Sequence, residues 1–396
     1  MGLAGRKITV LGAGVAGLAV SRALALRGAE VTVLEQAAEL DDIGAGLQIS
    51  PNGAAVLRGL GLDAAFTAAG LAAEAVELRD GRDDRLVTRL DLARLRPGQD
   101  YRFLHRADLI ALLAEGARDA GVNLRLLQKV ERVELVPGGP VLHSAQGAEL
   151  RPGLVIGADG LHSVLHRALH GVIAPQFTMQ TAWRAVIPCQ PGAPPVAEVH
   201  MGPRRHLVSY PLRGGRLRNI VAVEERHRWV EESWSLKDDA LEMRFAFEGF
   251  SPRVRGWLEQ AEECWLWGLF VHPVARHWYW AEGGRGAALL GDAAHPTLPF
   301  LAQGANMALE DAWVLAAMLD RHDDLAAALA GYQAARADRC ARIVAAAAGN
   351  ARAYHLRGPL RDMAHLGLRL AGRLAPAAML GRFDWIYGHD VTARTP

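Results

Sequence analysis

Cysteine is scarce in this 396-residue chain, which contains only Cys189, Cys264 and Cys340. Three cysteines so far apart in the sequence cannot form a disulfide framework or a zinc site of ordinary spacing. Such scarcity is typical of proteins from reducing compartments, so we expect a cytoplasmic protein.

Long apolar runs and an excess of charge of one sign are also absent. No stretch of about eighteen consecutive apolar residues occurs, so we expect no membrane-spanning helix. The first residues, MGLAGRKITVLGAG, lead directly into an apolar run, which is not the pattern of a cleavable signal peptide. The formal net charge of +1 and the scattered basic residues give no reason to expect a nucleic-acid partner.

The composition is that of a globular protein, because 51% of the residues are hydrophobic and 22% are charged. The length suits two interlocked domains. Strand-like and helix-like stretches alternate towards both ends, whereas short alternating strands dominate the middle. This order predicts an α/β domain with a separate β domain inserted into it.

The first motif is GAGVAG, which follows an apolar strand expected over 7–11. A helix expected over 18–27 and a second strand expected over 31–34 complete a βαβ unit that ends at Glu35. In this unit Gly12 permits the tight turn, Gly14 lets the backbone approach a pyrophosphate, and Gly17 lets helix and strand pack closely. Glu35 is placed to bind ribose hydroxyls, so the sequence predicts a dinucleotide site.

The second motif, GDAAHPTLPFLAQGAN, covers 291–306 and follows an apolar strand expected over 287–290. Asp292 stands where this strand ends, so its carboxylate can accept a hydrogen bond from a sugar-type hydroxyl. Pro296 and Pro299 stiffen the loop that follows. Gly304 begins a helix whose first N–H groups suit a pyrophosphate or a polarised ring carbonyl.

Other candidate residues lie between these two motifs. Asp159 and Gly160, in the motif LVIGADG, again follow a buried strand. Gln48, in the segment GAGLQISPN, is either a ring or substrate contact or a polar surface residue. Arg106 begins a helix, which favours a nearby anion, either a pyrophosphate or the side chain of Asp108.

Three histidines, His162, His166 and His170, are spaced to share one helical face. No carboxylate or cysteine completes a metal site with them, so we expect no bound metal.

The middle of the chain predicts an antiparallel sheet, with strands expected over 180–187, 197–201, 206–212, 217–224 and 264–269. We assign 75–98 and 176–281 to this domain, and 1–74, 99–175 and 282–345 to the α/β domain. The remaining segment, 346–396, is expected to be helical, with breaks near 349, 358 and 375. Its amphipathic, basic stretch 360–382 is expected to pack on the α/β domain, with contact to a membrane surface as the alternative.

With GAGVAG, LVIGADG and GDAAHP in this order, the chain resembles the single-component flavoprotein monooxygenases, the aromatic hydroxylase family. The resemblance implies an α/β + β fold, in which a Rossmann-type FAD-binding domain carries an inserted substrate domain. Because no second GxGxxG occurs, NADH or NADPH would bind transiently as co-substrate. The cofactor-binding residues that the resemblance implies are Gly12, Gly14, Ala16, Gly17, Glu35, Gln36, Gly46, Arg106, Asp159, Gly160, Gly291, Asp292, Pro299, Gly304, Ala305 and Asn306.

The segments TAWRAVIP (181–188), HLVSYPLRGG (206–215) and DWIYGHD (384–390) are similar to the branch of salicylate, 3-hydroxybenzoate and 6-hydroxynicotinate hydroxylases. This similarity implies substrate contacts from Gln48, Trp183, His206 and Tyr210, with His206, Tyr210 and Pro299 as catalytic residues. His206 and Tyr210 are four apart on an expected strand, so both can face the same side.

The implied activity is hydroxylation of a small phenolic or N-heteroaromatic acid with NAD(P)H and O₂, through a flavin C4a-hydroperoxide. An electrophilic oxygen reacts best with a phenolate, which gives His206 the role of base, directly or through Tyr210. The alternative for His206 is an exposed position on the outer face of the sheet. Arg184 and Arg213 are candidates for binding a substrate carboxylate.

Two other functions stay open at this point. One is hydroxylation of a larger quinone-precursor or secondary-metabolite aromatic, and the other is a flavin-binding redox sensor without monooxygenation. A homodimer is the expectation from the frequency of dimers among soluble proteins.

Overall fold

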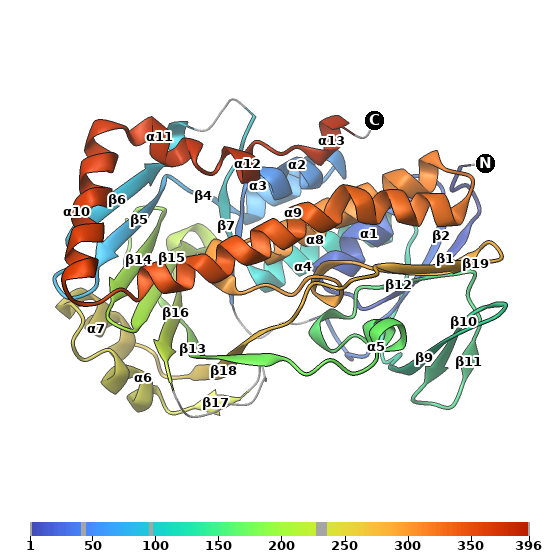
Figure 1. Cartoon of the computed structure of the whole chain (residues 1–396), viewed down its shortest axis with the longest axis horizontal. Helices are drawn as coiled ribbons and strands as arrows, with labels where there is room; N and C mark the ends of the chain where they lie inside the picture. Colours follow the sequence, from blue (N-terminus) through green and yellow to red (C-terminus); the bar gives the residue numbers. More distant parts are fainter. Residues whose placement is uncertain (1, 41–44, 95–97, 227–235, 395–396) are drawn as a thin grey trace.

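The computed structural model describes residues 2–40, 45–94, 98–226 and 236–394. The fold is built around two large sheets, and long helices run beside both (Figure 1). The prediction of an α/β unit combined with a separate β-sheet is confirmed.

The first sheet is the mostly parallel one, and it carries the GAGVAG, LVIGADG and GDAAHP motifs at the ends of its strands. Among its described strands, only β19 (Tyr279–Glu282) and β20 (Arg285–Leu289), at one edge, pair antiparallel. Its central strands are largely apolar and buried, as parallel strands covered on both faces must be, whereas its two edge strands are partly exposed. In spatial order they are β19 (Tyr279–Glu282), β20 (Arg285–Leu289), β12 (Leu154–Gly157), β1 (Lys7–Leu11), β2 (Glu30–Leu34) and β8 (Asn123–Arg125).

Helices cover this sheet, and a small antiparallel sheet lies beside it. The helix after GAGVAG begins at Val15, three residues before the predicted start, because Gly14 already serves as its N-cap. The helices are α1 (Val15–Ala25), α4 (Arg106–Asp119), α5 (Val164–His170), α8 (Gly304–Arg321) and α9 (Leu325–Tyr354), and the small sheet is β9 (Val130–Val136), β10 (Gly139–Ser144) and β11 (Glu149–Leu150).

The second large sheet has eight strands among the described residues, most of them from the middle of the chain. It is antiparallel, as expected, except that β14 (Val196–Gly202) and β5 (Ala75–Asp80) pair in parallel. In spatial order the strands are β17 (Lys237–Asp238), β18 (Cys264–Val271), β13 (Gln176–Pro188), β16 (Leu217–Glu225), β15 (Arg205–Leu212), β14 (Val196–Gly202), β5 (Ala75–Asp80) and β6 (Leu86–Asp91).

The two faces of this sheet have different neighbours. Alternate side chains point to opposite faces, and one face packs on α6 (Ala240–Ala246) and α7 (Pro252–Glu259) in an apolar cluster around Trp183 and Phe247. The other face meets Leu298 and Phe300 near the short helix η5 (Pro299–Leu301), and Ala351 of α9. The second face therefore turns towards the end of the GDAAHP motif.

A third sheet and two helices connect the large sheets. The strands β3 (Gly46–Ile49), β7 (Arg102–His105) and β4 (Leu71–Ala72) pair in this order, and α2 (Pro51–Gly59) and α3 (Asp63–Ala69) flank them. The remaining short helices are η1 (Leu92–Arg94), η2 (Gly160–His162), η3 (Arg213–Gly215) and η4 (Gly291–Ala293).

The C-terminal segment differs from the prediction in two ways. The expected break at Gly349 does not occur, because α9 continues to Tyr354 and the buried Ala347 and Ala351 outweigh the modest helix cost of one glycine. The next helix, α10 (Gly358–Leu374), packs on β6 rather than on the α/β domain (Figure 1). The predicted breaks at 358 and 375 are confirmed, with α11 (Pro376–Gly381), α12 (Asp384–Tyr387) and α13 (Val391–Arg394) following.

Helices α12 and α13 do lie against α2, beside the α/β domain. The division of the chain into domains therefore stays a proposal that rests on the two sheets, and its boundary at 345/346 falls within α9. Among the described residues, no helix is both long and apolar enough to cross a membrane.

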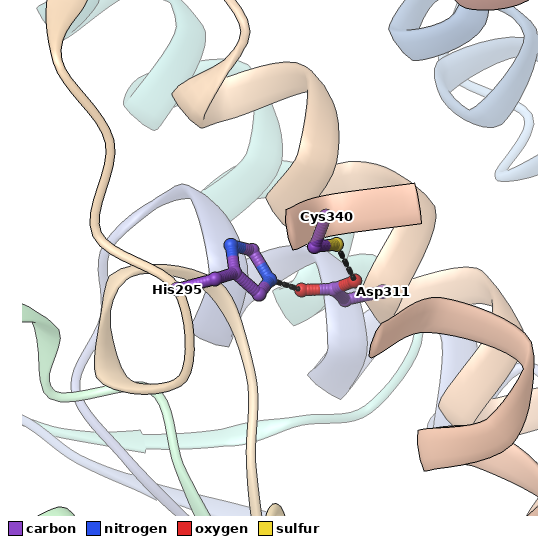
Figure 2. Close-up of side chains that lie close together, drawn as sticks. All are labelled: His295, Asp311 and Cys340. Carbon is purple, nitrogen blue, oxygen red and sulfur yellow. Dashed lines mark hydrogen bonds and ion pairs between the residues drawn. The ribbon is translucent and has the colours of Figure 1, made fainter. Parts of the chain in front are cut away.

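A buried charged cluster joins the GDAAHP motif to α8 and α9. The Asp311 carboxylate lies 2.5 Å from His295 Nε2 and 2.7 Å from Arg336 Nε, and it accepts a hydrogen bond from the Gly291 N–H. Figure 2 shows His295 and Cys340 on either side of this carboxylate. Burial opposes the charged form, but Asp311 raises the pKa of His295 well above its ordinary value. Protonated His295 and Arg336 both carry positive charge beside Asp311, so they disfavour a metal ion there.

Its neighbour Glu310 is also fully buried and makes a second set of bonds. Arg336 and Arg339 of α9 both pair with it, and Asn52 of α2 donates a hydrogen bond to it. Although burial disfavours its charged form, Arg336 and Arg339 lower the pKa of Glu310 to about 2. The carboxylate therefore stays charged at all ordinary pH values and depends on its cations.

We predict that Arg336→Met lowers the free energy of unfolding by about 3–5 kcal/mol, because it leaves buried carboxylates short of a partner. Urea denaturation measures this. The control is Arg352→Met, an exposed arginine on the same helix, which should stay within about 0.5 kcal/mol of the parent. Similar small losses in the two variants would contradict the role assigned to the cluster.

Candidate active site

A groove of about 570 Å³ opens at the carboxyl ends of β1, β2 and β12. This edge of a doubly wound sheet is where such folds bind nucleotides. The groove brings together six of the predicted cofactor residues and several residues that were not predicted to bind the cofactor. The predicted ones are Gly12, Gly14, Glu35, Gln36, Asp159 and Gly160, and the others include Gln128, Lys129, His162 and Arg167.

The three glycines of GAGVAG have different structural roles. Gly12 has φ +93°, and a Cβ there would lie 2.6 Å from the Ala158 carbonyl oxygen. A Cβ on Gly17 would overlap the Gly12 carbonyl oxygen, so this glycine is required for packing. Gly14 differs, because a Cβ there would meet nothing within 4 Å among the described residues. The open space above Gly14, at the start of α1, fits a pyrophosphate.

Two acidic side chains complete the nucleotide end of the groove. Glu35 accepts hydrogen bonds from the N–H groups of Ala13 and Ala37, at 2.7 and 2.8 Å, which fixes its carboxylate. Asp159 Oδ2 accepts from the Val164 N–H at 2.8 Å, and burial raises the pKa of this carboxyl. The second oxygen, Oδ1, is buried without a hydrogen-bond partner among the described residues, so a donor from a ligand would satisfy it.

The residues expected at the flavin end lie around η4 and the start of α8. Asp292 has an exposed side chain between buried Gly291 and Ala293, so it opens away from the core. Arg106, at the first position of α4, interacts electrostatically with Asp292. Pro299 is exposed, and Gly304 and Ala305 are half-buried in the first turn of α8, where N–H groups have no partner within the helix.

Three predicted cofactor residues have mainly structural contacts. The Asn306 side chain is fully buried and bonds Ser50 N, Gln48 O and Ala302 O, so only its backbone remains for a cofactor. The Gly46 N–H donates to Asn219, and a Cβ on Gly46 would lie 2.6 Å from the ring of Tyr210. Ala16 packs against Gly291, because a Cβ placed on Gly291 would lie 3.0 Å from the Ala16 Cβ. Any contact of Asn306 with the cofactor would therefore come from its backbone.

The substrate residues predicted on β15 share one face of the eight-stranded sheet. His206 and Tyr210 are both buried, and the half-buried Val208 lies between them on the same face. The exposed position considered for His206 is excluded, because the ring is 0% exposed. It contacts the rings of Phe300 and Tyr354, with centroids 5.3 and 5.2 Å away.

A half-buried strip crosses this face between His206 and Tyr210. Arg184 of β13 pairs in register with Val221 of β16, which pairs with Val208 of β15. These three side chains are accessible, whereas His206 and Tyr210 on either side are buried. The Cα atoms of residues four apart on a strand are separated by about 13 Å. That spacing exceeds the width of one substituted ring, which would have to lie over Val208.

Tyr210 is placed as a hydrogen-bond donor. The Tyr101 hydroxyl donates to Gln48 Oε1 at 2.7 Å, so the Gln48 amide N–H₂ is the group that faces the Tyr210 oxygen. The Tyr210 proton can therefore point at a ligand. Burial raises the pKa of Tyr210 despite the opposing influence of Arg184, so Tyr210 stays protonated and is not itself the base.

Trp183 lies on the opposite face of the sheet, and its expected contact with substrate is wrong. Its indole N–H donates to Asp238 at 2.7 Å, and its ring packs against Phe247 under α6 and α7. The alternation of side chains along β13 sends Trp183 one way and Arg184 the other. Of these two neighbouring candidates, only Arg184 lies on the face that bears His206.

The two arginines proposed to bind a substrate carboxylate, Arg184 and Arg213, have different surroundings. Arg213 donates two hydrogen bonds to Asp108, at 2.8 and 3.0 Å, so both are committed to an ion pair. Arg184 lies over the ring of Trp267, 4.3 Å from its centroid, on the same face as His206. Arg184 is therefore the better placed of the two.

The three spaced histidines make no metal site together. His166 Nδ1 lies 2.7 Å from the Ala293 carbonyl, and His170 Nε2 lies 2.8 Å from the His277 carbonyl. His162 belongs to η2 rather than to the same helix.

The fold and the groove agree with comparisons to known proteins. A family model described as an FAD binding domain matches residues 6–347. The chain belongs to this family. The expected membership among FAD-dependent aromatic monooxygenases, with FAD as cofactor, is confirmed.

Two relatives match nearly the whole chain. The 3-amino-4-hydroxybenzoate 2-monooxygenase PtmB3 of Streptomyces platensis is 36% identical, over 97% of this chain and 96% of the relative. A 3-hydroxybenzoate 6-hydroxylase of Polaromonas naphthalenivorans is 32% identical, also over 97% of this chain and 96% of the relative.

Solved structures agree with the fold. A salicylate hydroxylase in a substrate complex superposes with TM-score 0.80 at 23% identity, covering 99% of this chain and 97% of that chain. Klebsiella pneumoniae HpxO, complexed with FAD and uric acid, superposes with TM-score 0.80 at 24% identity, covering 96% and 97%.

We predict that Gly14→Asp abolishes most FAD binding by this family member without loss of folding. Aspartate is a favourable N-cap for α1 and has room there, but its charge would face the pyrophosphate. Gly14→Asn, of the same size without the charge, is the matched control and should retain at least about tenfold more affinity. Flavin absorbance of the purified protein and FAD titration of the apoprotein measure this, and equal FAD affinity in the two variants would contradict the assignment.

Proposed function

We propose that this FAD-dependent monooxygenase hydroxylates a small phenolic or N-heteroaromatic acid, with NAD(P)H as reductant and O₂ as oxidant. The observation that carries the proposal is the accessible strip Arg184–Val221–Val208, bounded by His206 on one side and Tyr210 on the other. This strip has a cation and two apolar side chains, flanked by a base and a hydrogen-bond donor. It suits one aromatic ring that carries a carboxylate and a hydroxyl.

The names of the relatives support this substrate class. One acts on 3-amino-4-hydroxybenzoate, a second on 3-hydroxybenzoate, and a 6-hydroxynicotinate 3-monooxygenase of Bordetella bronchiseptica is 32% identical over 85% of this chain. All three substrates combine a ring carboxylate with a ring hydroxyl. The same two groups are those that the Arg184 and His206 side chains would recognise.

Each proposed residue has a distinct role. His206 accepts the proton of the ring hydroxyl, which makes the ring electron-rich. Tyr210 donates a hydrogen bond, and Arg184 holds the carboxylate. Pro299 and Phe300 bound the site near the start of α8 and exclude water. Bound FAD supplies the activated oxygen that such a ring accepts.

Cofactor binding is assigned to the groove and to the GDAAHP motif. Gly12, Gly14 and Glu35 would hold the adenosine diphosphate half, and Asp292 would hold the ribityl chain. The first N–H groups of α8 would meet the flavin ring. These assignments are supported by the open space above Gly14 and the accessible Asp292.

Several finer points are part of the proposal. A cytoplasmic location is supported by the three free cysteines. A homodimer remains a prediction from the frequency of dimers. A larger quinone-precursor or secondary-metabolite substrate is the second candidate, and the substrate panel below distinguishes it.

The first test follows NADH and NADPH oxidation and peroxide release with a substrate panel. It contains 3-amino-4-hydroxybenzoate, 3-hydroxybenzoate, 6-hydroxynicotinate, salicylate and a quinone-precursor phenol. We expect one acid to accelerate oxidation by at least about tenfold with little peroxide, because the site is matched to the ring and protects the activated oxygen. If only the larger phenol is coupled, the small-acid proposal is wrong, and a redox sensor would respond to none of them.

The second test asks whether Arg184 binds the carboxylate. We predict that Arg184→Met raises KM for the preferred acid by about tenfold or more, because a charge-assisted contact is lost. The KM for the corresponding ring amide should change little in this variant, since the amide carries no charge. Arg213→Met is the matched control, because Arg213 is committed to Asp108. A similar KM change for acid and amide would contradict the carboxylate role.

A further inference from the structure

His206 is the inner end of a row of side chains that leads from the substrate face to the surface. Its Nδ1 lies 2.7 Å from His355 Nε2. His355 Nδ1 lies 3.1 Å from Glu225 Oε1, and Arg204 Nε donates to Glu225 Oε2 at 2.9 Å. Exposure rises along this row, from 0% for His206 to 2% for the His355 side chain and 32% for the Glu225 side chain.

The row is assembled from segments far apart in the sequence. His206 is on β15, Glu225 ends β16, and Arg204 is in the turn between β14 and β15. His355 follows the last residue of α9, which runs across the molecule to reach this sheet (Figure 1). The Arg204 N–H donates to the His355 carbonyl, and the Glu225 N–H donates to the Arg204 carbonyl. These backbone bonds hold the three segments together.

The hydrogen bonds fix the tautomer of both imidazoles. An ionised carboxylate only accepts, so His355 must donate to Glu225 from Nδ1. A neutral His355 then has a bare Nε2, which can only accept, so His206 must donate to it from Nδ1. The consequence is that His206 Nε2 carries a lone pair and no proton. This atom is buried and has no hydrogen-bond partner among the described residues.

The charges around the row support neutral rings and an ionised carboxylate. Burial and the neighbouring His355 lower the pKa of His206, and burial lowers the pKa of His355 although Glu225 opposes this. Burial opposes ionisation of Glu225, but Arg204 and His355 keep its pKa below the ordinary value. Arg205 is the other charged group that acts on His355. Phe300 and Tyr354, which pack on His206, bring no charge at neutral pH.

We propose that His355 and Glu225 are positioning residues that hold His206 with its Nε2 unprotonated and conduct the substrate's proton to solvent. The proposal rests on the proposed function only in taking a ring hydroxyl as the proton source. The hydroxyl O–H bond breaks and its proton binds His206 Nε2, while the Nδ1 proton of His206 passes to His355 Nε2. The Nδ1 proton of His355 passes to Glu225, which releases it to water.

The reverse transfer completes the cycle. When the product oxygen is protonated again, His206 Nε2 gives up its proton and the row is refilled from water through Glu225. Neither imidazole has to rotate, and one proton leaves and one returns per turnover. The buried site therefore exchanges protons with solvent without admitting water to the ring.

The first experiment measures tautomers in the resting protein and needs no substrate. Long-range ¹H–¹⁵N correlation spectra of ¹⁵N-histidine-labelled holoenzyme distinguish Nδ1–H from Nε2–H rings. The chain has 15 histidines, and the spectra of His206→Asn and His355→Ala assign the two of interest. We expect both to be Nδ1–H in the parent, and His206 to lose this preference in Glu225→Gln. An Nε2–H tautomer for His206 in the parent would overturn the inference.

The matched control is Glu224→Gln, the adjacent carboxylate on the same strand. Its side chain points to the opposite face, where it pairs with Arg226 at 2.9 Å. The variant removes the same charge from β16 without touching the row. We expect the His206 tautomer and the pH dependence of this variant to match those of the parent.

The second experiment measures the ionisation of a bound phenolic acid by its ultraviolet absorbance, together with kcat against pH. In Glu225→Gln and His355→Ala, phenolate formation should move to higher pH by about one unit or more, with KM within about twofold and FAD content unchanged. Added imidazole should restore part of the kcat of His355→Ala, which a purely structural defect would not allow. If Glu225→Gln behaves like Glu224→Gln in both experiments, the proton pathway is wrong.

Failure of the proposed function is distinguishable from failure of this inference. If His206→Asn leaves phenolate formation and the pH profile unchanged, His206 is not the base, and the proposed catalytic role fails. The tautomers in the resting parent protein still decide the arrangement of the row, because that measurement involves no substrate.

Discussion

Glu310 and Asp311, two adjacent buried carboxylates on α8, hold together the parts of the chain that make the active site. Between them they bind Asn52 of α2, two arginines of α9, and Gly291 and His295 of the GDAAHP motif. Buried charges are stable only when fully paired, so this arrangement fixes where α9 runs relative to α8. It thereby fixes the loop expected to meet the flavin and the position at which the far end of α9 reaches the eight-stranded sheet.

That sheet separates structural from chemical side chains by simple alternation. On one face Trp183 packs with Phe247 under α6 and α7, while on the other Arg184 and His206 face η5. A shift of one residue in the register would exchange the two sets. The proposed substrate specificity is therefore a property of strand register as much as of residue identity.

Because His206 is buried, it cannot exchange protons with water directly. A base with no access to water needs a neighbour that exchanges protons for it, and His355 and Glu225 occupy that place. His355 comes from the segment that the sequence indicated only as helical. The C-terminal end of α9 thus connects cofactor binding, through Glu310 and Asp311, with the proposed proton path.

The sequence by itself determined the βαβ groove and the strand bearing His206 and Tyr210, because these depend on local spacing: glycines at fixed intervals, an acid after a strand, two residues four apart. Its resemblance to the aromatic hydroxylases indicated the family and FAD. Only the tertiary structure decided that Trp183 faces α6 and α7, whereas Arg184 lies on the face with His206. It also decided that the Asn306 side chain bonds β3 and that α10 packs on β6. It alone brought His355 to His206, 149 residues apart along the chain. Such contacts depend on how sheets and helices pack, and no local pattern encodes which distant segment will cover a given face.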